Sequence, residues 1–437
     1  MQLKILVIAP NGREHCLAQA YAKSKNVTRV FITPGNGLSD FTNKKIVNVP
    51  IPMTDIDRII AFAKKEKVDL VDVPQEDCLA AGYIDRFEKE GISAFGPTQK
   101  IAELESSKEW SRNFMKKYKL PIPKFHTFSD SQKAVEFIKK QREQLWYIKA
   151  SGLAFGKGAI RAETKPQAID AIHAMKQFGK AGETFLVEEC LVGEEFSFFA
   201  ICDGKNYILS KSAQDHKTVF AGDEGPNTGG IGTISPTLAL SKKDINEIEA
   251  KIIKPVLLGM KKEKRPYKGI LYVGGMRTKS GIKIIEFNCR WGDPEAEVII
   301  PSIQTEYTTL ALSVVRQTLK KTKITFDSKT RIAVTGCSRG YPNDYSKVKG
   351  KEIFGLLDVL KIPGITVFGS GIIRKGKRFF ANGGRIFHLV AEGRDVIDAR
   401  KKAYGAMGLI FIEGNNLHFR TDIGWRDVQR LSLSSRT

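Results

Sequence analysis

The sequence predicts a protein of several domains that combines α/β and α+β architecture, and two patterns support this prediction. In the first hundred residues, short apolar strands alternate with helical segments, for example strand 4–9, helix 14–24 and strand 30–32. This order is typical of βαβ units that build a mostly parallel sheet. From residue 146 the order becomes strand, glycine loop, strand, helix and strand, which indicates an α+β domain.

We expect three domains. Residues 1–103 carry the βαβ pattern and are predicted to form a Rossmann-like N-terminal domain. Residues 104–330 are predicted to form the α+β domain, with a small flap subdomain at about 121–190 and a larger subdomain at 191–330. Residues 331–437 carry further strand patterns and a helix pattern at 396–407, which predicts a separate, closing C-terminal domain.

Length and composition exclude several classes of protein. The chain has 437 residues, 42% of them hydrophobic, so it can bury more than one core and is too apolar to be disordered. Its longest apolar runs, such as residues 5–9, are far too short to cross a bilayer. Six cysteines without a Cys-x-x-Cys pair predict neither a disulfide framework nor a zinc site. We therefore expect a soluble, cytoplasmic protein with no membrane partner.

The net charge of +22 favours anionic partners, namely nucleotides, phosphorylated metabolites or nucleic acid. Much of this charge lies in mixed stretches such as 261–265 and 347–351, which are typical of solvated faces and turns. Because aromatic residues are not interleaved with these charges, the pattern argues against a nucleic-acid partner.

Glycine loops are the first candidates for binding phosphate. Residues 10–15 follow the first strand and open a helix, whose free N–H groups can receive an anion. The loop 152–158 lies between two strands, unlike a Walker A loop, and is predicted to fold as a flap. Its residues Gly156, Lys157 and Gly158 would approach the phosphates, and Lys149 on the preceding strand can present a point charge. A plain flexible hairpin is the alternative.

The segment 188–195 can serve the other end of a nucleotide. A strand edge with a free backbone could pair with an adenine ring, and carboxylates follow it for the ribose hydroxyls. Taken alone, the segment is equally an ordinary acidic loop.

The strongest local signal is the segment 285–295. Glu286, Asn288 and Arg290 are two residues apart, so on a strand they share one face while Phe287 and Cys289 enter the core. A carboxylate and an amide oxygen suit a magnesium ion that bridges phosphates. Arg290 could stabilise charge on a transferring phosphoryl group. The alternative is a half-exposed strand with alternating polar residues.

A long polar stretch follows in two blocks, 214–217 and 222–232. A glycine-rich loop of this length is costly to order unless it binds a ligand. We interpret His216 as a scaffold or substrate contact, because acyl-phosphate chemistry needs orientation and charge neutralisation more than a histidine base.

With these blocks in this order, the chain resembles the ATP-grasp superfamily and, more narrowly, the phosphoribosylamine-glycine ligases of purine biosynthesis. The resemblance runs from Gly12-Arg13-Glu14-His15 to Asp422-Ile423-Gly424. Gln214-Asp215-His216-Lys217 followed by Gly225-Pro226-Asn227-Thr228-Gly229-Gly230 is specific to this family. It implies an ATP-grasp fold, ATP with Mg²⁺ or Mn²⁺, and ligation of glycine to 5-phosphoribosylamine through glycyl phosphate.

The resemblance also assigns roles to individual residues. The phosphates would be held by Lys108 and Lys149, the nucleoside by Glu188, Leu191 and Glu195, and the metal by Glu286 and Asn288. Catalytic residues would be Arg290, Asp293 and Asp215. The two acceptor substrates would contact Gly12, Arg13, Glu14, Glu76, Asn227, Thr228, Gly229, Gly230 and Arg385.

This sequence departs from the family pattern at several positions. Ala9-Pro10-Asn11-Gly12 replaces the usual Gly-Asn-Gly-Gly, and Pro74-Gln75-Glu76 replaces Gly-Pro-Glu. Ser151 replaces an aspartate and Ile231 a methionine. The first two departures fall where the amine substrate is expected to bind.

Two other functions fit the same residues less well. One is an ATP-grasp carboxylate-amine ligase with a different amine, and the other is a non-catalytic basic protein that binds nucleotide or nucleic acid. Retention of the full set Lys149, Glu286, Asn288 and Arg290 argues against the second. We expect a monomer or a weak homodimer.

Overall fold

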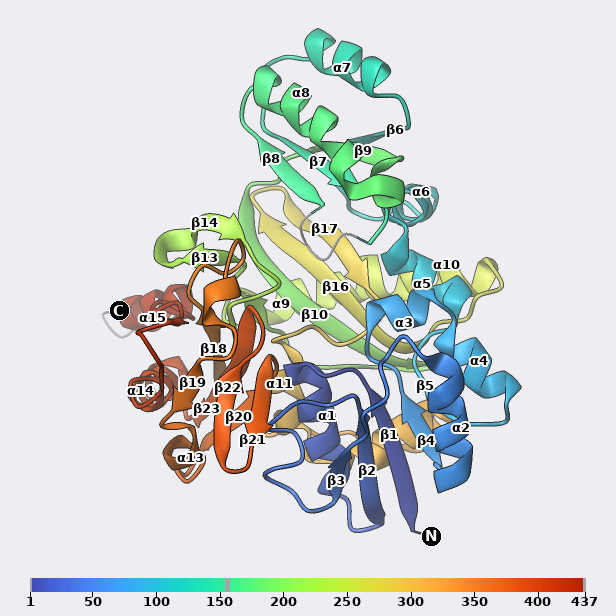
Figure 1. The fold of residues 1–437 in the computed structure, drawn as a ribbon. Coiled ribbons are helices and arrows are strands. Elements are labelled where there is room, and N and C mark those ends of the chain that lie inside the picture. Colours follow the sequence, from blue (N-terminus) through green and yellow to red (C-terminus); the bar gives the residue numbers. More distant parts are fainter. Residues whose placement is uncertain (1, 154–157, 435–437) are drawn as a thin grey trace.

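The computed structural model describes residues 2–153 and 158–434, and it confirms the mixed α/β architecture. In Figure 1 the N-terminal sheet lies at the lower right, the C-terminal sheets lie at the lower left, and a small lobe stands above a central sheet.

The N-terminal part is a five-stranded sheet in the order β3-β2-β1-β4-β5, in which every pairing is parallel. This confirms the βαβ interpretation. A side chain of Asp55 caps helix α2 by accepting a hydrogen bond from the N–H of Arg58, and Lys67 ends it in the left-handed conformation. The elements are β1 (Leu3–Ile8), α1 (Gly12–Ala22), β2 (Val27–Thr33), β3 (Ile46–Asn48), α2 (Ile56–Glu66), β4 (Leu70–Asp72), α3 (Glu76–Ala80), α4 (Tyr83–Lys89) and β5 (Ala94–Phe95).

Two helices lead from this sheet to the lobe at the top of Figure 1, which has a hydrophobic core of its own. The lobe is an antiparallel sheet in the order β6-β9-β7-β8. Its elements, with the leading helices, are α5 (Gln99–Ser106), α6 (Lys108–Lys117), β6 (Phe125–Phe128), α7 (Ser131–Lys140), β7 (Trp146–Ala150), β8 (Ala159–Ala162), α8 (Lys165–Ala174), the 3₁₀ segment Met175–Gly182 and β9 (Phe185–Glu189).

The central sheet is antiparallel, in the order β11-β10-β16-β17. Phe287 and Cys289 enter its core, as the alternation along β17 predicts. The elements are β10 (Gly193–Asp203), β11 (Tyr207–Leu209), α9 (Lys242–Ile248), the π segment Glu249–Ile253, α10 (Lys254–Lys262), β16 (Lys268–Thr278), β17 (Gly281–Asn288), α11 (Ala296–Ile299) and α12 (Tyr307–Val315).

The C-terminal part contains two sheets, and the larger one includes strands from the middle of the chain. Its order is β12-β15-β18-β23-β20, where β15 (Gly232–Ser235) pairs with β18 (Thr330–Ser338) and β12 (Gln214–Asp215) with β15. The polar stretch 214–232 thus joins the C-terminal sheet, although it lies far upstream of the boundary expected at residue 330. The hairpin β13 (Thr218–Phe220) and β14 (Glu224–Asn227) projects from it.

The smaller C-terminal sheet has the order β21-β22-β19-β24, and helix α14 packs against β23 and β18 of the larger one. The remaining elements are β19 (Glu352–Phe354), α13 (Leu356–Val359), β20 (Ile365–Gly369), β21 (Ile372–Lys375), β22 (Arg378–Ala381), β23 (Arg385–Gly393), α14 (Val396–Met407), β24 (Phe411–Ile412), β25 (Leu417–His418) and α15 (Trp425–Ser434).

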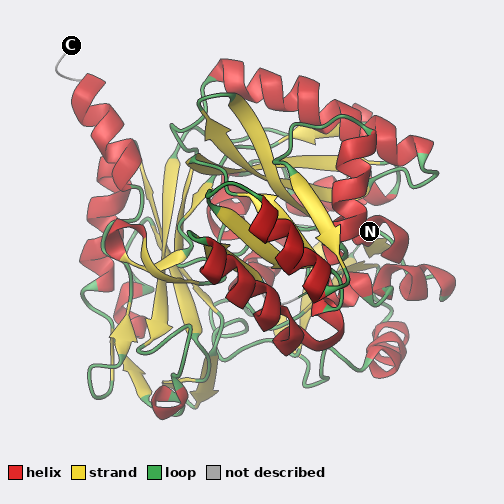
Figure 2. Ribbon diagram, turned by 90° about the horizontal axis from the view of Figure 1, so that it is seen from above, coloured by secondary structure: helices red, strands yellow, loops and turns green. Residues whose placement is uncertain are grey.

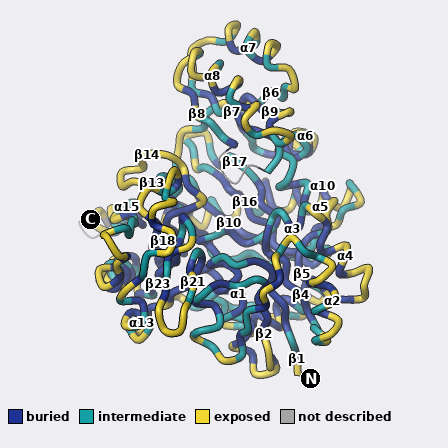
Figure 3. Tube along the Cα trace, viewed as in Figure 1, coloured by how far each residue is buried: buried dark blue, intermediate teal, exposed yellow. Residues whose placement is uncertain are grey.

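One hydrophobic core joins three of these parts. It contains Val7 of β1, Phe199 of β10, Trp291 after β17 and Phe368 of β20. Figure 2 shows helices on the outer faces with the strands between them, and Figure 3 shows buried residues along these strands and exposed residues on the outer loops. Within the described residues, the core of the lobe shares no residue with this joint core. None of the helices in the described residues is long and apolar enough to span a bilayer.

The buried carboxyl group of Asp72 on β4, which faces Tyr21 on α1, makes the stability of the fold depend on pH. Burial raises the pKa of Asp72 to about 7, although the Tyr21 hydroxyl donates to its Oδ2 at 2.7 Å and partly opposes the shift. Since an unfolded aspartate has a pKa of about 3.9, the free energy of unfolding should fall by up to about 1.4 kcal/mol per pH unit from this group between about pH 4 and 7.

Asp72→Asn should flatten this decline, because the amide cannot titrate and its oxygen can still accept from Tyr21. Urea unfolding at several pH values between 5 and 8 measures the slope. Asp57→Asn, which alters an exposed aspartate, is the control and should keep the wild-type slope. Equal slopes for wild type and Asp72→Asn would contradict the assignment.

Candidate active site

A buried ion pair fixes the lysine that is predicted to hold phosphate. Lys149 Nζ on β7 lies 2.7 Å from Glu188 Oε2 on β9. Arg112 on α6 donates to the same carboxylate from Nε and Nη2, and its Nη2 also donates to the carbonyl of Ile285 at 2.6 Å. Burial would raise the pKa of Glu188, but Arg112 and Lys149 outweigh this effect and lower it to about 2. The charged side chain of Arg112 therefore links Glu188 of the lobe to β17.

Lys108 lies at the base of the glycine loop. Its backbone N–H donates to the carbonyl of Ser151 at 2.9 Å, and its Nζ lies 3.4 Å from the carbonyl oxygen of Gly152. Burial lowers the pKa of Lys108, and Lys149 adds to this effect, whereas Glu286 opposes it. Gly158 closes the loop by accepting from the N–H of Ala150 at 2.7 Å. The predicted contacts Gly156 and Lys157 lie outside the described residues.

Glu286 on β17 faces a ring of cations. Burial raises its pKa, but Lys217, Lys108, Lys149 and Arg290 together lower it below the ordinary value, so the carboxylate is ionised. Asn288 lies two residues further along the same strand and is buried. An ionised carboxylate and an amide oxygen form an all-oxygen donor pair, which fits Mg²⁺ or Mn²⁺.

Acidic side chains also surround Lys217, beside Glu286. Its Nζ is 3.6 Å from Asp215 Oδ2, and a small cavity there is also lined by Glu195, Glu286 and Tyr272. Burial raises the pKa of Asp215 to about 7, although Lys217 opposes the shift. Desolvation would lower the pKa of Lys217, but the surrounding acidic groups raise it well above the ordinary value.

Arg290 bridges the central sheet and the N-terminal part. Its Nε lies 3.2 Å from Glu76 Oε2 at the start of α3, and its Nη2 lies 3.0 Å from Glu105 Oε1 on α5. Burial would raise the pKa of Glu76, but Arg290 and Arg13 lower it. The predicted catalytic residue Arg290 and the predicted substrate contact Glu76 thus form one ion pair.

Arg13 is enclosed behind this pair. Its Nε donates to Glu14 at 2.7 Å, its Nη1 to the carbonyl of Trp291 at 3.1 Å, and its Nη2 to Gln75 Oε1 at 2.7 Å. Both Arg13 and Glu14 are buried, so they support the loop before α1. Gln75, a departure from the family pattern, supplies one of the three acceptors.

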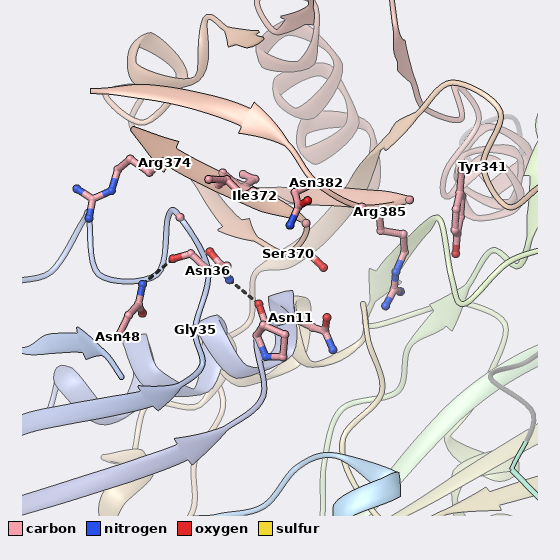
Figure 4. Close-up of a pocket in the computed structure, with 16 residues that line it drawn as sticks. Asn11, Gly35, Asn36, Asn48, Tyr341, Ser370, Ile372, Arg374, Asn382 and Arg385 are labelled. Carbon is pink, nitrogen blue, oxygen red and sulfur yellow. Dashed lines mark hydrogen bonds between the residues drawn. The ribbon is translucent and has the colours of Figure 1, made fainter. Parts of the chain in front are cut away.

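A cavity of about 600 Å³ opens between the N-terminal and C-terminal parts. As Figure 4 shows, Asn11, Asn36 and Asn48 line one side, and Arg374, Asn382 and Arg385 belong to the other. The Asn36 side chain holds the two sides together, since its Nδ2 donates to the carbonyls of Pro10 and Gly369, each at 2.7 Å. The remaining lining residues are Pro10, Gly35, Gly37, Tyr341, Ser370, Gly371, Ile372, Ile373, Gly383 and Gly384.

Arg385 connects this cavity to the central sheet. Its Nη1 donates to the carbonyls of Gly229 at 3.0 Å and Asp293 at 2.8 Å, and it lies 3.0 Å from Asp293 Oδ1. Thr228 turns the loop back by donating to the carbonyl of Lys217 at 2.7 Å, while Asn227 is exposed. The structure thus brings the predicted residues Asp215, Gly229, Gly230, Asp293 and Arg385 into one region.

The predicted nucleoside contacts lie at the junction of the lobe and the central sheet. Leu191 and Val192 connect β9 to β10, with Leu191 half-buried and Val192 exposed. Glu195 lies near the start of β10. Glu188 differs, because Arg112 and Lys149 occupy both of its carboxylate oxygens. We expect it to position Lys149.

Sequence reasoning missed several residues of the site. Arg112 follows Lys108 by one helical turn, and Lys217 follows Asp215 by one strand period. The spacing therefore places each of them on the same face as the predicted residue before it. Gln75 and Asn11 were recognised as departures on the amine side, but the sequence did not reveal that Gln75 pairs with Arg13. His216 fits the scaffold interpretation, because its Nε2 accepts from the N–H of Gly424 at 3.2 Å and burial lowers its pKa to about 4.

Comparison with known families agrees with this arrangement. The N domain, the ATP-grasp (A) domain and the C domain of phosphoribosylglycinamide synthetase match residues 3–105, 106–296 and 331–426. The phosphoribosylamine-glycine ligase of Caldanaerobacter subterraneus subsp. tengcongensis is 38% identical over 428 residues, which cover 96% of this chain and 99% of the relative.

The chain belongs to the phosphoribosylglycinamide synthetase family. The phosphoribosylamine-glycine ligase of Streptococcus pneumoniae serotype 4 is also 38% identical to this chain, and the alignment covers 98% of this chain and 100% of the relative. A crystal structure of the Thermotoga maritima ligase superposes with a TM-score of 0.80 at 29% identity, covering 96% of this chain and 100% of that one. Membership confirms the predicted ATP-grasp fold and an ATP-dependent ligase that uses a divalent metal ion.

The buried ion pair of the lobe yields a prediction. Glu188→Gln leaves Arg112 and Lys149 without their counter-charge, and breaking a buried pair costs about 3–5 kcal/mol. We expect the variant to unfold at a lower urea concentration and to show a KM for ATP raised at least about tenfold, which corresponds to about 1.4 kcal/mol. Urea unfolding and steady-state kinetics measure these effects.

Glu189→Gln is the matched control, because it removes the same charge from the exposed neighbouring position. It should change neither quantity appreciably. A wild-type KM for ATP in Glu188→Gln would show that Lys149 does not depend on this carboxylate.

Proposed function

We propose that this protein joins glycine to 5-phosphoribosylamine with ATP, giving glycinamide ribonucleotide, ADP and phosphate. The observations that carry the proposal are the small cavity that Glu286, Asp215 and Lys217 line together and the polar interdomain cavity that ends at Arg385. Family membership and the family-specific blocks at residues 214–217 and 225–230 support it.

The first step forms an acyl phosphate. A carboxylate oxygen of glycine attacks the γ-phosphorus of ATP, and the bond from that phosphorus to the bridging oxygen breaks, so ADP leaves and glycyl phosphate forms. Lys108 and Lys149 would hold the phosphates, and Arg290 would stabilise the charge that spreads over the transferring group. Glu286 and Asn288 would hold Mg²⁺ or Mn²⁺, which neutralises phosphate charge when bound.

The second step forms the amide. The amine nitrogen of phosphoribosylamine attacks the glycyl carbonyl carbon, the carbon–oxygen bond to phosphate breaks, and the nitrogen loses a proton. Asp215 is suited to accept this proton, because burial raises its pKa to about 7, close to the working pH of a cytoplasmic enzyme. The loop that contains Asn227, Thr228, Gly229 and Gly230 would hold glycine nearby.

The interdomain cavity is the proposed site for the amine substrate. Its side-chain amides can bind ribose hydroxyls and phosphate oxygens, and Arg385 supplies a positive charge. Pro10 and Asn11 line it, so the altered loop before α1 would contact this substrate directly. Gly12, Arg13, Glu14 and Glu76 would support that loop and the ion pair behind it.

The proposal also includes the domain boundaries, the oligomeric state and the cellular location. The match to the N domain ends at residue 105 and the match to the C domain begins at residue 331, which supports domain boundaries near 103 and 330. We propose a monomer or weak homodimer that works in the cytoplasm, where its substrates are made and consumed.

Release of ADP tests the function. Purified protein with ATP, Mg²⁺, glycine and freshly formed phosphoribosylamine should release ADP, and omission of either acceptor should stop it. Glu286→Ala should lower kcat by at least about a thousandfold, about 4 kcal/mol, because the metal loses its only carboxylate in the proposed pair. Its circular dichroism should match that of wild type.

Lys283→Ala on the same strand is the control and should keep its turnover. Release of ADP only with a different amine would overturn the substrate assignment. Full activity of Glu286→Ala would place the metal elsewhere.

Gln75→Ala tests the altered amine side. Loss of the acceptor for Arg13 Nη2 leaves a buried guanidinium group partly unsatisfied, which costs about 1–3 kcal/mol. We expect the KM for phosphoribosylamine to rise about tenfold, about 1.4 kcal/mol, with the KM for ATP unchanged. Gln132→Ala, at an exposed position, should leave both constants at wild-type values. Equal rises in both constants for Gln75→Ala would indicate a general loss of structure instead.

A further inference from the structure

Two acidic side chains and a histidine meet behind the interdomain cavity. Asp293 lies after β17, Glu297 on α11 and His388 on β23, and their ligand atoms all lie within 4.8 Å of one another. His388 Nε2 is 3.1 Å from Asp293 Oδ1 and 3.8 Å from Glu297 Oε1. We propose that these three side chains bind a divalent transition-metal ion, at a site separate from Glu286 and Asn288.

The polar atoms of this cluster lack ordinary partners. Within residues 2–153 and 158–434, both carboxylate oxygens of Glu297 and of Asp293 are buried without a hydrogen bond, and so is His388 Nε2. The 3.1 Å contact between Asp293 Oδ1 and His388 Nε2 is within hydrogen-bond distance, so a proton on Nε2 would join these two atoms in the metal-free protein. Glu297 and His388 have no exposed side-chain surface. Carboxylates in such a place are costly unless a cation or a proton joins them.

The histidine is oriented to donate a lone pair to a metal. Thr335 Oγ1 lies 2.9 Å from His388 Nδ1. With the proton on Nδ1 donated to this hydroxyl, Nε2 presents its lone pair to the two carboxylates. Two carboxylates facing a lone pair repel it, whereas a cation between them would be bound by all three. A partner on the far ring nitrogen is the usual support of a metal-bound histidine.

The electrostatic surroundings agree with a single bound cation. Burial lowers the pKa of His388, although Asp293 opposes this, and the neutral imidazole is the form that binds metal. Burial and the charge of Asp293 raise the pKa of Glu297. Arg385 lies 3.0 Å from Asp293 Oδ1 and compensates only part of the negative charge.

The site would join three parts of the chain. A Cβ atom added at Gly12 would lie 2.7 Å from Glu297 Oε1 and 2.2 Å from His388 Cδ2, so the start of α1 packs directly on the cluster. The donor set of one imidazole and two carboxylates suits Zn²⁺, Mn²⁺, Fe²⁺ or Co²⁺ better than Mg²⁺. A bound ion would therefore fasten the segment after β17, α11 and β23 to one another, directly beneath the start of α1.

Zinc binding to the full chain tests the proposal. Protein is first treated with chelator and then incubated with Zn²⁺ in the absence of nucleotide. It should retain one Zn²⁺ per chain after gel filtration, measured by inductively coupled plasma mass spectrometry, and Zn²⁺ should raise its Tm. The same experiment in the Glu286→Ala background excludes the nucleotide-side metal site. His388→Gln and Glu297→Gln should each weaken Zn²⁺ binding at least about tenfold in calorimetric titration.

His173→Gln is the matched control, because His173 is an exposed histidine on α8, and it should bind Zn²⁺ as wild type does. X-ray absorption of the Zn²⁺-loaded wild-type chain keeps the test decisive if a variant fails to fold. It should show one imidazole with oxygen donors and no sulfur. Absence of bound Zn²⁺, sulfur in the coordination shell, or wild-type affinity in both His388→Gln and Glu297→Gln would overturn the proposal and leave a proton as the group that joins these side chains.

Discussion

The arrangement of the site depends on the side chain of Arg385. It binds the carbonyl oxygens of Gly229 and Asp293 and the carboxylate of Asp293, so it holds together three segments that lie far apart in the sequence. Pairing of β15 with β18 brings the first segment to the C-terminal sheet, and the shared core, which contains Trp291, fixes the segment after β17 against the N-terminal part. Arg112 ties the lobe to this frame, because it forms an ion pair with Glu188 and donates a hydrogen bond to the carbonyl of Ile285.

Local patterns predicted most of the fold. The alternation of strands and helices before residue 100 gave the parallel sheet, and the two-residue spacing of Glu286 and Asn288 gave the shared face of β17. The pattern could not predict that β12 and β15 join the C-terminal sheet. Each of these strands is short. β12 pairs with β15, and β15 pairs with β18, which lies about a hundred residues downstream, so tertiary packing decides the pairing.

The same distinction applies to the site. The residues proposed to contact nucleotide and metal lie in compact motifs, where chemistry and spacing can be recognised together. The amine side is assembled from long-range contacts, such as Arg13 with Gln75 and Asn36 with Gly369. Gln75 therefore looked like a loss in the sequence, whereas in the structure it provides an acceptor for a buried arginine. The effect of a substitution at such a position can be interpreted only when the residues that it contacts are known.

Transfer of oxygen from glycine to phosphate tests the central claim most directly. With glycine labelled by ¹⁸O in both carboxylate oxygens, formation of glycyl phosphate and its attack by the amine leave one labelled oxygen in the amide and transfer the other to phosphate. Mass spectrometry of the released phosphate should therefore show one ¹⁸O atom per turnover. Phosphate without label, formed together with ADP and the amide, would contradict activation of the carboxylate by ATP at this site.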